Sequence, residues 1–172
     1  DEPWFRWPAE IASRKPSALA AAWRKYRRKT EKEKFIQFIF YRQWEELRRS
    51  ARARKIAIIG DIPFFVSHDS ADVWVHRRLF QVDNSGRRTA LSGVPPSDVD
   101  ATSQIWGNPL YNWKEMARDG YTWWRARFQN ALRLVDIVRI DHFSGFYACW
   151  KIPCGAETSA VGEWEKGPGE KL

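Results

Sequence analysis

The stretch that decides the fold is residues 138–145, which read VRIDHFSG. The apolar residues Val138 and Ile140 alternate there with two charged ones. Side chains at positions i and i+2 of a β-strand share a face, so we expect Arg139 and Asp141 to lie side by side where an apolar strand ends. A carboxylate next to a guanidinium stays ionised. A fixed anion of this kind suits the nucleophile of a covalent group transfer, such as glycosyl transfer, although a purely structural ion pair fits the same spacing.

A second strand is predicted upstream, where residues 56–59 are all apolar and are followed by Gly60 and Asp61. A run that is apolar on both faces is typical of a buried parallel strand. Asp61 would then follow its strand as Asp141 ends the other, at the C-terminal rim of a parallel barrel, where active sites are built. A turn residue before Pro63 explains Asp61 equally well.

The N-terminal third is predicted to be helical. One helix is expected from Ser17 to about Lys29. The capping-box pattern Thr-Glu-Lys-Glu at residues 30–33 predicts the start of a second helix, which should run to about Arg54. Its apolar stripe, at helical spacing, consists of Ile36, Phe40, Trp44, Leu47 and Ala51.

The order of elements predicts an α/β fold: a partial (β/α)8 TIM barrel with a long inserted loop region between two parallel strands. We expect residues 1–172 to be part of a single catalytic barrel domain. We expect its parts to be, in chain order, a helical segment (1–55), a strand (56–66), inserted loops (67–111), helices broken near Gly120 (112–135), a strand (136–143) and a loop-rich segment (144–172). Because two strands do not form a stable sheet alone, the sequence is expected to be an internal segment of a larger barrel.

Composition narrows the classes of function. The net charge of +8 comes from residues 1–55, which carry 16 Lys and Arg against 7 Asp and Glu. A charged helical run such as residues 24–29 is usually a solvated face, so no nucleic acid is expected as partner, and a basic nucleic-acid-associated protein is kept as an alternative. No apolar run approaches the roughly 20 residues of a membrane helix. Cys149 and Cys154 form no Cys-x-x-Cys pair, which favours a reducing, cytoplasmic location.

Two further side chains are candidates for the site. Trp106 precedes the turn at residues 107–109, in a predicted loop, where an aromatic ring can stack on a sugar face or anchor the loop. His142 points away from Asp141 in a regular strand and reaches the same side only if the strand ends there. No second His stands at ligand spacing, so no metal is expected. No glycine-rich phosphate loop indicates a nucleotide cofactor.

Several motifs together resemble the 4-α-glucanotransferases, the amylomaltase or disproportionating-enzyme family (glycoside hydrolase family 77). In chain order they are QW (43–44), IIGDIP (58–63), DSADVW (69–74), GVPP (93–96), QIWGNPLY (104–111), RIDHF (139–143), G-x-W (162–164) and GPG (167–169). The resemblance runs from about Phe35 to Leu172. So many motifs in the same order make a chance resemblance very unlikely.

The resemblance implies a retaining transfer of α-1,4-glucan segments between maltodextrins through a covalent glucosyl-enzyme, with no cofactor and no metal. It implies that Asp141 is the nucleophile and that Arg139 orients it. It also implies that His142 and Asp61 hold the sugar at the cleavage point, and that Trp106 lies in a loop arching over the substrate cleft. The implied partner is a maltodextrin or another α-1,4-glucan, with no role for nucleic acid or a membrane.

The chain departs from the family pattern at Ser97, Ser103 and Ser144, where the family usually has Asp, Gly and Arg. The changes at Ser97 and Ser144 affect expected acceptor-side contacts. The family's general acid, a Glu, and its transition-state-stabilising Asp belong to later strands, which the resemblance places outside these residues. The chain alone is therefore expected to be inactive, and a non-catalytic glucan-binding module is kept as an alternative.

Overall fold

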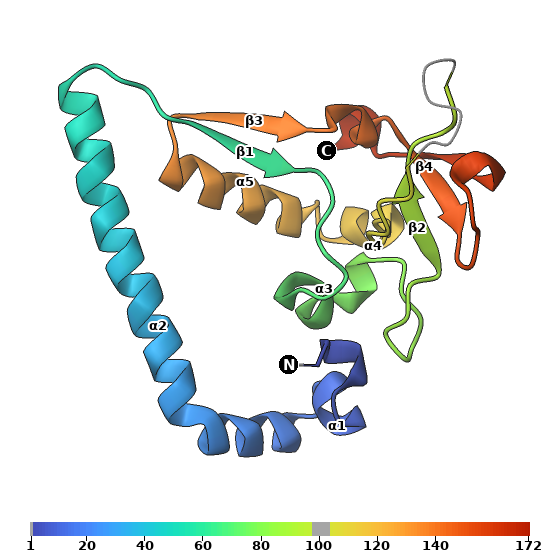
Figure 1. Ribbon diagram of the computed structural model, residues 1–172, viewed down its shortest axis with the longest axis horizontal. Helices are drawn as coiled ribbons and strands as arrows, with labels where there is room; N and C mark the ends of the chain where they lie inside the picture. Colours follow the sequence, from blue (N-terminus) through green and yellow to red (C-terminus); the bar gives the residue numbers. More distant parts are fainter. Residues whose placement is uncertain (1, 98–103) are drawn as a thin grey trace. The chain divides into compact units, whose positions relative to one another are not determined.

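The computed structural model describes residues 2–97 and 104–172 (Figure 1), so Ser103 lies outside the described residues. The chain divides into two compact units. The first contains residues 1–7, 63–123 and 142–172, and the second contains residues 8–62 and 124–141. Each unit mixes helices with a small open sheet.

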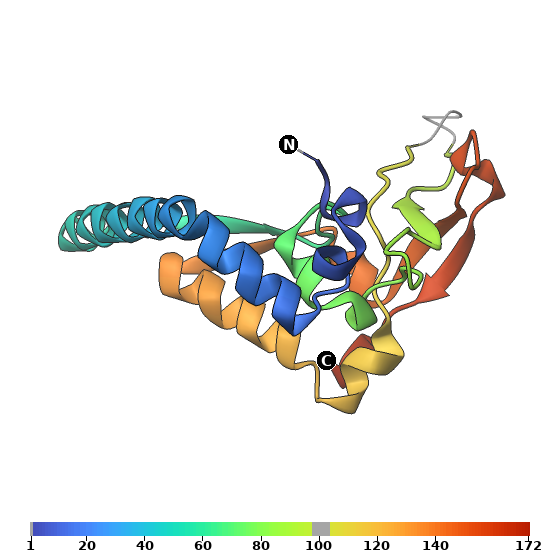
Figure 2. The same ribbon diagram turned by 90° about the horizontal axis from the view of Figure 1, so that it is seen from below.

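One long helix dominates the second unit. After the short helix α1 (Ala9–Ala12), helix α2 runs without interruption through Pro16–Ala53 (Figure 2). The predicted break at Thr30 is wrong. The residues around it are good helix formers, with neither Gly nor Pro, so the helix continues through the capping pattern. Across that point, Lys34 Nζ lies 2.9 Å from Glu31 Oε1, one turn away.

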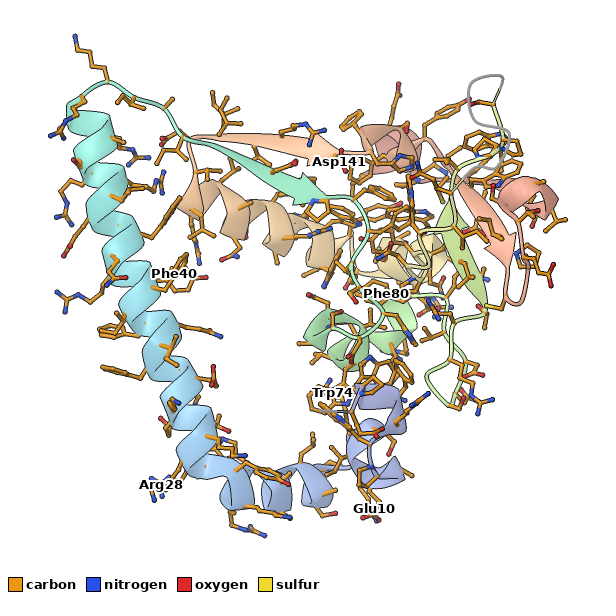
Figure 3. All side chains as sticks on the ribbon, viewed as in Figure 1. Glu10, Arg28, Phe40, Trp74, Phe80 and Asp141 are labelled. Atoms are coloured by element: carbon orange, nitrogen blue, oxygen red, sulfur yellow. The ribbon has the colours of Figure 1, made fainter. Side chains whose placement is uncertain are left out.

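The side chains of α2 are largely exposed, and none of its residues is buried. The predicted apolar stripe therefore does not face a core within this unit: Ile36, Phe40 and Leu47 are each about half exposed. Figure 3 shows Phe40 and Arg28 projecting from the helix. The basic run at residues 24–29 is exposed, as expected for a solvated face.

Asp136 ties α2 to the segment that leads into β1. Its Oδ1 accepts hydrogen bonds from Arg48 Nη2 at 2.9 Å and Arg52 Nη2 at 2.6 Å, and its Oδ2 accepts one from the Ile58 amide at 3.1 Å. Trp44, half-buried on the same helix, donates from Nε1 to the Leu134 carbonyl at 2.7 Å. Polar bonds, more than apolar burial, therefore hold α2 within its unit.

Two neighbouring strands form the sheet of the second unit. Strands β1 (Ile59–Pro63) and β3 (Ile137–Asp141) are hydrogen-bonded neighbours, and their arrows point the same way in Figure 1. The prediction of β3 is confirmed. The strand predicted at residues 56–59 lies further along the chain, so Asp61 belongs to β1 and does not follow it. Ile59 is exposed because a two-stranded sheet leaves its faces open.

Helix α5 (Thr122–Leu134) lies alongside these strands (Figures 1 and 2). Its Trp124 is fully buried, as predicted. A Cβ atom at Gly60 would lie 2.7 Å from Val135 Cγ1, so the close approach of β1 to the end of this helix requires glycine. The predicted helix break is confirmed at Gly120, whose φ of +67° follows helix α4 (Trp113–Arg118).

The first unit contains an antiparallel sheet in the order β2–β4–β5. Its strands are β2 (Ala90–Gly93), β4 (Ala148–Pro153) and β5 (Glu163–Lys166). Two of them lie where a loop-rich stretch was predicted. They were missed because the buried residues of β4, Cys149 and Ile152, are three positions apart and β5 has no buried residue, so neither strand shows the two-residue alternation of a half-buried strand.

The segment predicted as inserted loops also contains β2 and the short helix α3 (Ala71–Val75). The 3₁₀ turns of the unit are Trp4–Arg6 (η1), Arg77–Leu79 (η2), Phe143–Phe146 (η3), Ser159–Val161 (η4) and Gly169–Lys171 (η5). No helix among the described residues is both long and apolar enough to cross a membrane.

The core of the first unit is aromatic. Phe64 lies at its centre, with its ring centroid 4.8 Å from that of Phe65, 4.9 Å from Phe146 and 5.3 Å from Tyr111. The Tyr111 hydroxyl donates a hydrogen bond to the Phe64 carbonyl. These rings are buried and pack largely edge to face, an arrangement favoured by their quadrupoles.

Candidate functional site

The centre of the candidate site is a guanidinium between two carboxylates. Arg139 donates from Nη2 to Asp141 Oδ1 at 2.8 Å and from Nη1 to Asp61 Oδ2. The predicted sharing of one strand face by Arg139 and Asp141 is confirmed. Asp61 reaches the same guanidinium from the neighbouring strand, which confirms that the two strands bring both carboxylates to one place. Figure 3 labels Asp141 at the end of β3.

The two carboxylates favour the charged form of Arg139. The hydrogen bond to Asp141 raises the pKa of Arg139, and the negative charges of Asp61 and Asp141 raise it further. All three side chains are more than half exposed. Ion pairs this exposed contribute little to stability, so folding energy alone does not account for the cluster. The geometry orients one carboxylate, Asp141, which Arg139 holds through Oδ1.

His142 ends the strand. Its φ of 54° and ψ of 46° lie in the left-handed region, so the alternation of β3 stops at Asp141. Such a backbone is uncommon outside glycine and often marks a functional position. The imidazole packs against Trp106 at 4.9 Å and 90°, and against Phe64 and Phe65 at 5.8 and 5.9 Å. The sequence predicts that His142 reaches the same side as Asp141 only if the strand ends there. The strand does end there.

Trp106 lies in an extended segment of the first unit. Its amide donates to the Ser92 carbonyl at 2.9 Å, and its indole Nε1 donates to Gln104 Oε1 at 3.0 Å. The indole packs against His142 and remains 38% exposed. It is therefore both an anchor and an accessible aromatic surface.

Sequence reasoning missed two rings near the site, Phe65 and Tyr111. Phe65 contacts His142 and Trp106, and it stacks on Tyr111 with ring centroids 6.1 Å apart and planes 11° apart. We call Phe65, Trp106, Tyr111 and His142 the aromatic wall. The signal that could have found Phe65 is its apolar side chain near the end of the stretch predicted as strand (56–66).

The described residues also include metal-ligating and thiol side chains. Within residues 2–97 and 104–172, no group of three or more His, Cys, Asp or Glu is placed to hold a metal ion. Cys149 and Cys154 are free thiols, and burial raises the pKa of Cys149 to about 12. A thiol with so high a pKa is a poor nucleophile at neutral pH.

An α/β segment with an arginine-held carboxylate at a strand end, and aromatic rings on the residues that follow, fits an enzyme that acts on sugars by covalent catalysis. The family model described as 4-alpha-glucanotransferase (glycoside hydrolase family 77) matches residues 1–172. The chain belongs to this family.

Curated relatives align with nearly the whole of this chain. It is 46% identical to the 4-alpha-glucanotransferase of Thermus thermophilus over 170 residues, covering 99% of this chain and 34% of that protein. It is 44% identical to the 4-alpha-glucanotransferase of Streptococcus pneumoniae (strain TIGR4), covering 98% of this chain and 34% of that protein. The chain thus spans about a third of the length of the curated relatives it matches.

A solved structure shares the fold. The amylomaltase from Streptococcus agalactiae, in complex with acarbose, superposes with a TM-score of 0.96 at 37% identity. The match covers 99% of this chain and 35% of that chain. The mixed α/β fold described above is therefore that of the corresponding part of an amylomaltase.

Proposed function

We propose that these residues are the nucleophile-bearing part of a 4-α-glucanotransferase that acts on maltodextrins. The observation that carries the proposal is the 2.8 Å hydrogen bond that holds Asp141 to Arg139 at the end of β3. Membership of the family supports it, as does the acarbose complex of the amylomaltase from Streptococcus agalactiae.

We infer a barrel for the whole enzyme. Strands β1 and β3 run in parallel with α5 alongside them, which is the arrangement of consecutive units in a (β/α)8 barrel (Figure 1). In such a barrel the carboxyl ends of the strands form the active-site rim. We place Asp61 and Asp141 at that rim, in a single catalytic barrel domain to which all of residues 1–172 belong.

The proposed reaction has two steps. In the first, an Asp141 carboxylate oxygen attacks the anomeric carbon, the glycosidic C–O bond breaks, and the leaving oxygen takes a proton from a general acid. In the second, an acceptor glucan's hydroxyl loses its proton to that residue's carboxylate, bonds to the anomeric carbon and displaces Asp141. Both steps invert the anomeric carbon, so the α configuration is retained.

We do not assign Asp61 as the general acid. A general acid must donate a proton to the leaving oxygen. Asp61 Oδ2 already accepts a hydrogen bond from the Arg139 guanidinium. We assign Asp61 to holding sugar hydroxyls and place the general acid outside these residues.

The aromatic wall supplies the sugar-facing surface. The exposed part of Trp106 can stack on axial C–H groups of a pyranose. His142, placed by its left-handed backbone directly after Asp141, can hydrogen-bond a hydroxyl of the same sugar. We infer a cytoplasmic enzyme whose partner is an α-1,4-glucan and neither nucleic acid nor a membrane. The two free thiols suit a reducing compartment.

The test compares Asp141→Asn with the unchanged protein, in an enzyme of full family length that carries these residues. Asn keeps the shape of the side chain but removes the attacking charge, so disproportionation of maltotriose should fall by at least about a thousandfold while glucan binding persists. Thermal melting of the same samples is the control. In the same assay the 172-residue chain alone should release no glucose. A folded Asp141→Asn enzyme with a near-normal rate would overturn the assignment.

A further inference from the structure

A hollow with a volume of about 560 Å³ lies on the first unit, between the turn η3 and the end of β5. It is lined by Ser144, Tyr147, Ala148, Trp164 and residues 166–169. Small-molecule sites typically measure about 300–1,000 Å³. Two aromatic side chains are part of its lining, and both are open to solvent: Tyr147 is 82% exposed and Trp164 is 59% exposed.

The exposed Trp164 ring packs against the ring of Trp150 on the neighbouring strand. Trp150 lies opposite it across the β4–β5 pair, with ring centroids 5.2 Å apart and planes at 73°. Trp150 is itself fixed by a hydrogen bond from Nε1 to the Ser159 carbonyl at 2.8 Å. A Cβ atom at Gly162 would lie 2.3 Å from Trp150 Nε1, so glycine there lets the indole sit close to the backbone. The hairpin therefore presents an aromatic ring that loses little freedom on binding a ligand.

The backbone that borders the hollow packs on the aromatic core of the same unit. Gly167 donates its amide hydrogen to the Tyr147 carbonyl at 2.7 Å. A Cβ atom at Gly167 would lie 2.2 Å from the Phe146 carbonyl oxygen, so this wall of the hollow packs directly on Phe146. The Phe146 ring contacts Phe64 at 4.9 Å, and Phe64 contacts His142 at 5.8 Å.

We propose that this hollow is a subsite for an α-glucan, in which Tyr147 and Trp164 stack on the faces of sugar rings. The inference rests on the proposed function. The negative face of an aromatic ring complements the C–H groups of a pyranose, and Ser144 and Lys166 in the lining can hydrogen-bond its hydroxyls. The hollow would thus hold glucose units of the glucan other than the one at Asp141.

The experiment measures maltoheptaose affinity by calorimetry in an enzyme of full family length carrying these residues, with Asp141→Asn added to prevent turnover. Trp164→Ala and Tyr147→Ala should each weaken binding about three- to tenfold, the usual scale of one stacking contact. Trp164→Phe and Tyr147→Phe keep an aromatic ring and should restore most of the affinity. Trp23→Ala is the matched control, because Trp23 is also half exposed but lies on α2.

The outcomes separate this inference from the proposed function. If the enzyme with Asp141 intact transfers glucan but the alanine variants at 147 and 164 bind like Trp23→Ala, the subsite is wrong and the function stands. If that enzyme neither binds nor disproportionates maltodextrin, both are overturned. If Trp164→Ala lowers the melting temperature by disturbing Trp150, Tyr147→Ala decides, because its side chain is almost fully exposed.

Discussion

Arg139 is the residue on which the geometry of the site depends. Its planar guanidinium bonds two carboxylates on neighbouring strands at once, Asp141 through Nη2 and Asp61 through Nη1. A guanidinium can do this because its donors form a rigid fork, whereas an ammonium is a compact point charge. One cation thus positions both the proposed nucleophile, Asp141, and the carboxylate proposed to bind the sugar, Asp61.

Replacement of Arg139 by Lys should impair transfer more than stability. In an enzyme of full family length, we expect the disproportionation rate to fall at least about tenfold, because an ammonium cannot hold both carboxylates in the same plane. The melting temperature should change little, since the pairs are exposed. Arg118→Lys is the control, because Arg118 is exposed like Arg139 and also pairs with a carboxylate, that of Glu115. Equal rates for the two variants would contradict the orienting role.

At the scale of elements, short sequence patterns predicted the features that depend only on neighbouring residues. The pairing of Arg139 with Asp141 follows from the two-residue repeat of a strand, and the helix break follows from Gly120. The capping pattern at Thr30 failed because a signal of four residues does not stop a helix whose neighbours all favour helix. Strands β4 and β5 were missed because the buried residues of β4 lie three positions apart and β5 has no buried residue, so neither shows a two-residue alternation.

The contacts of the aromatic wall could not be predicted for a different reason. Phe65 and Tyr111 are 46 positions apart in the sequence, and no periodicity links them. Their stacking depends on the path of the chain between β1 and α4, which tertiary packing decides. The same holds for α2, where the apolar stripe was identified but its exposure was not.

The attachment of α2 predicts a pH-dependent stability. Hydrogen bonds from Arg52, the Ile58 amide and Arg48, in that order of importance, hold the pKa of Asp136 well below its usual range. A group whose pKa is lowered by folding stabilises the protein above its unfolded pKa of about 3.9 and loses this effect as the pH falls. Asp136→Asn should therefore lower the melting temperature at pH 7, and the difference from the unchanged protein should shrink below about pH 4.

Melting curves between pH 2 and pH 8 check this prediction. Glu31→Gln is the control, since Glu31 forms an exposed pair with Lys34 whose loss should matter little at any pH. A difference between Asp136→Asn and the unchanged protein that stays constant from pH 7 to pH 2 would show that the carboxylate charge does not stabilise α2.

At the scale of the whole molecule, the two groups of site residues belong to different units. The arginine cluster belongs to the second unit and the aromatic wall to the first, and the chain passes from one unit to the other between Asp141 and His142. The proposed nucleophile and the imidazole proposed to bind the sugar are therefore consecutive residues of the chain.

Direct capture of the covalent intermediate tests the central claim, that Asp141 is the nucleophile. A 5-fluoro-α-glucosyl fluoride carries a leaving group that departs with little acid assistance, and its ring fluorine slows hydrolysis of the ester that forms. After incubation with an enzyme of full family length, proteolysis and mass spectrometry should find one fluoroglucosyl group on the peptide that contains Asp141, and none in the Asp141→Asn variant. Label on Asp61 or on another carboxylate, with the Asp141 peptide unmodified, would contradict the account.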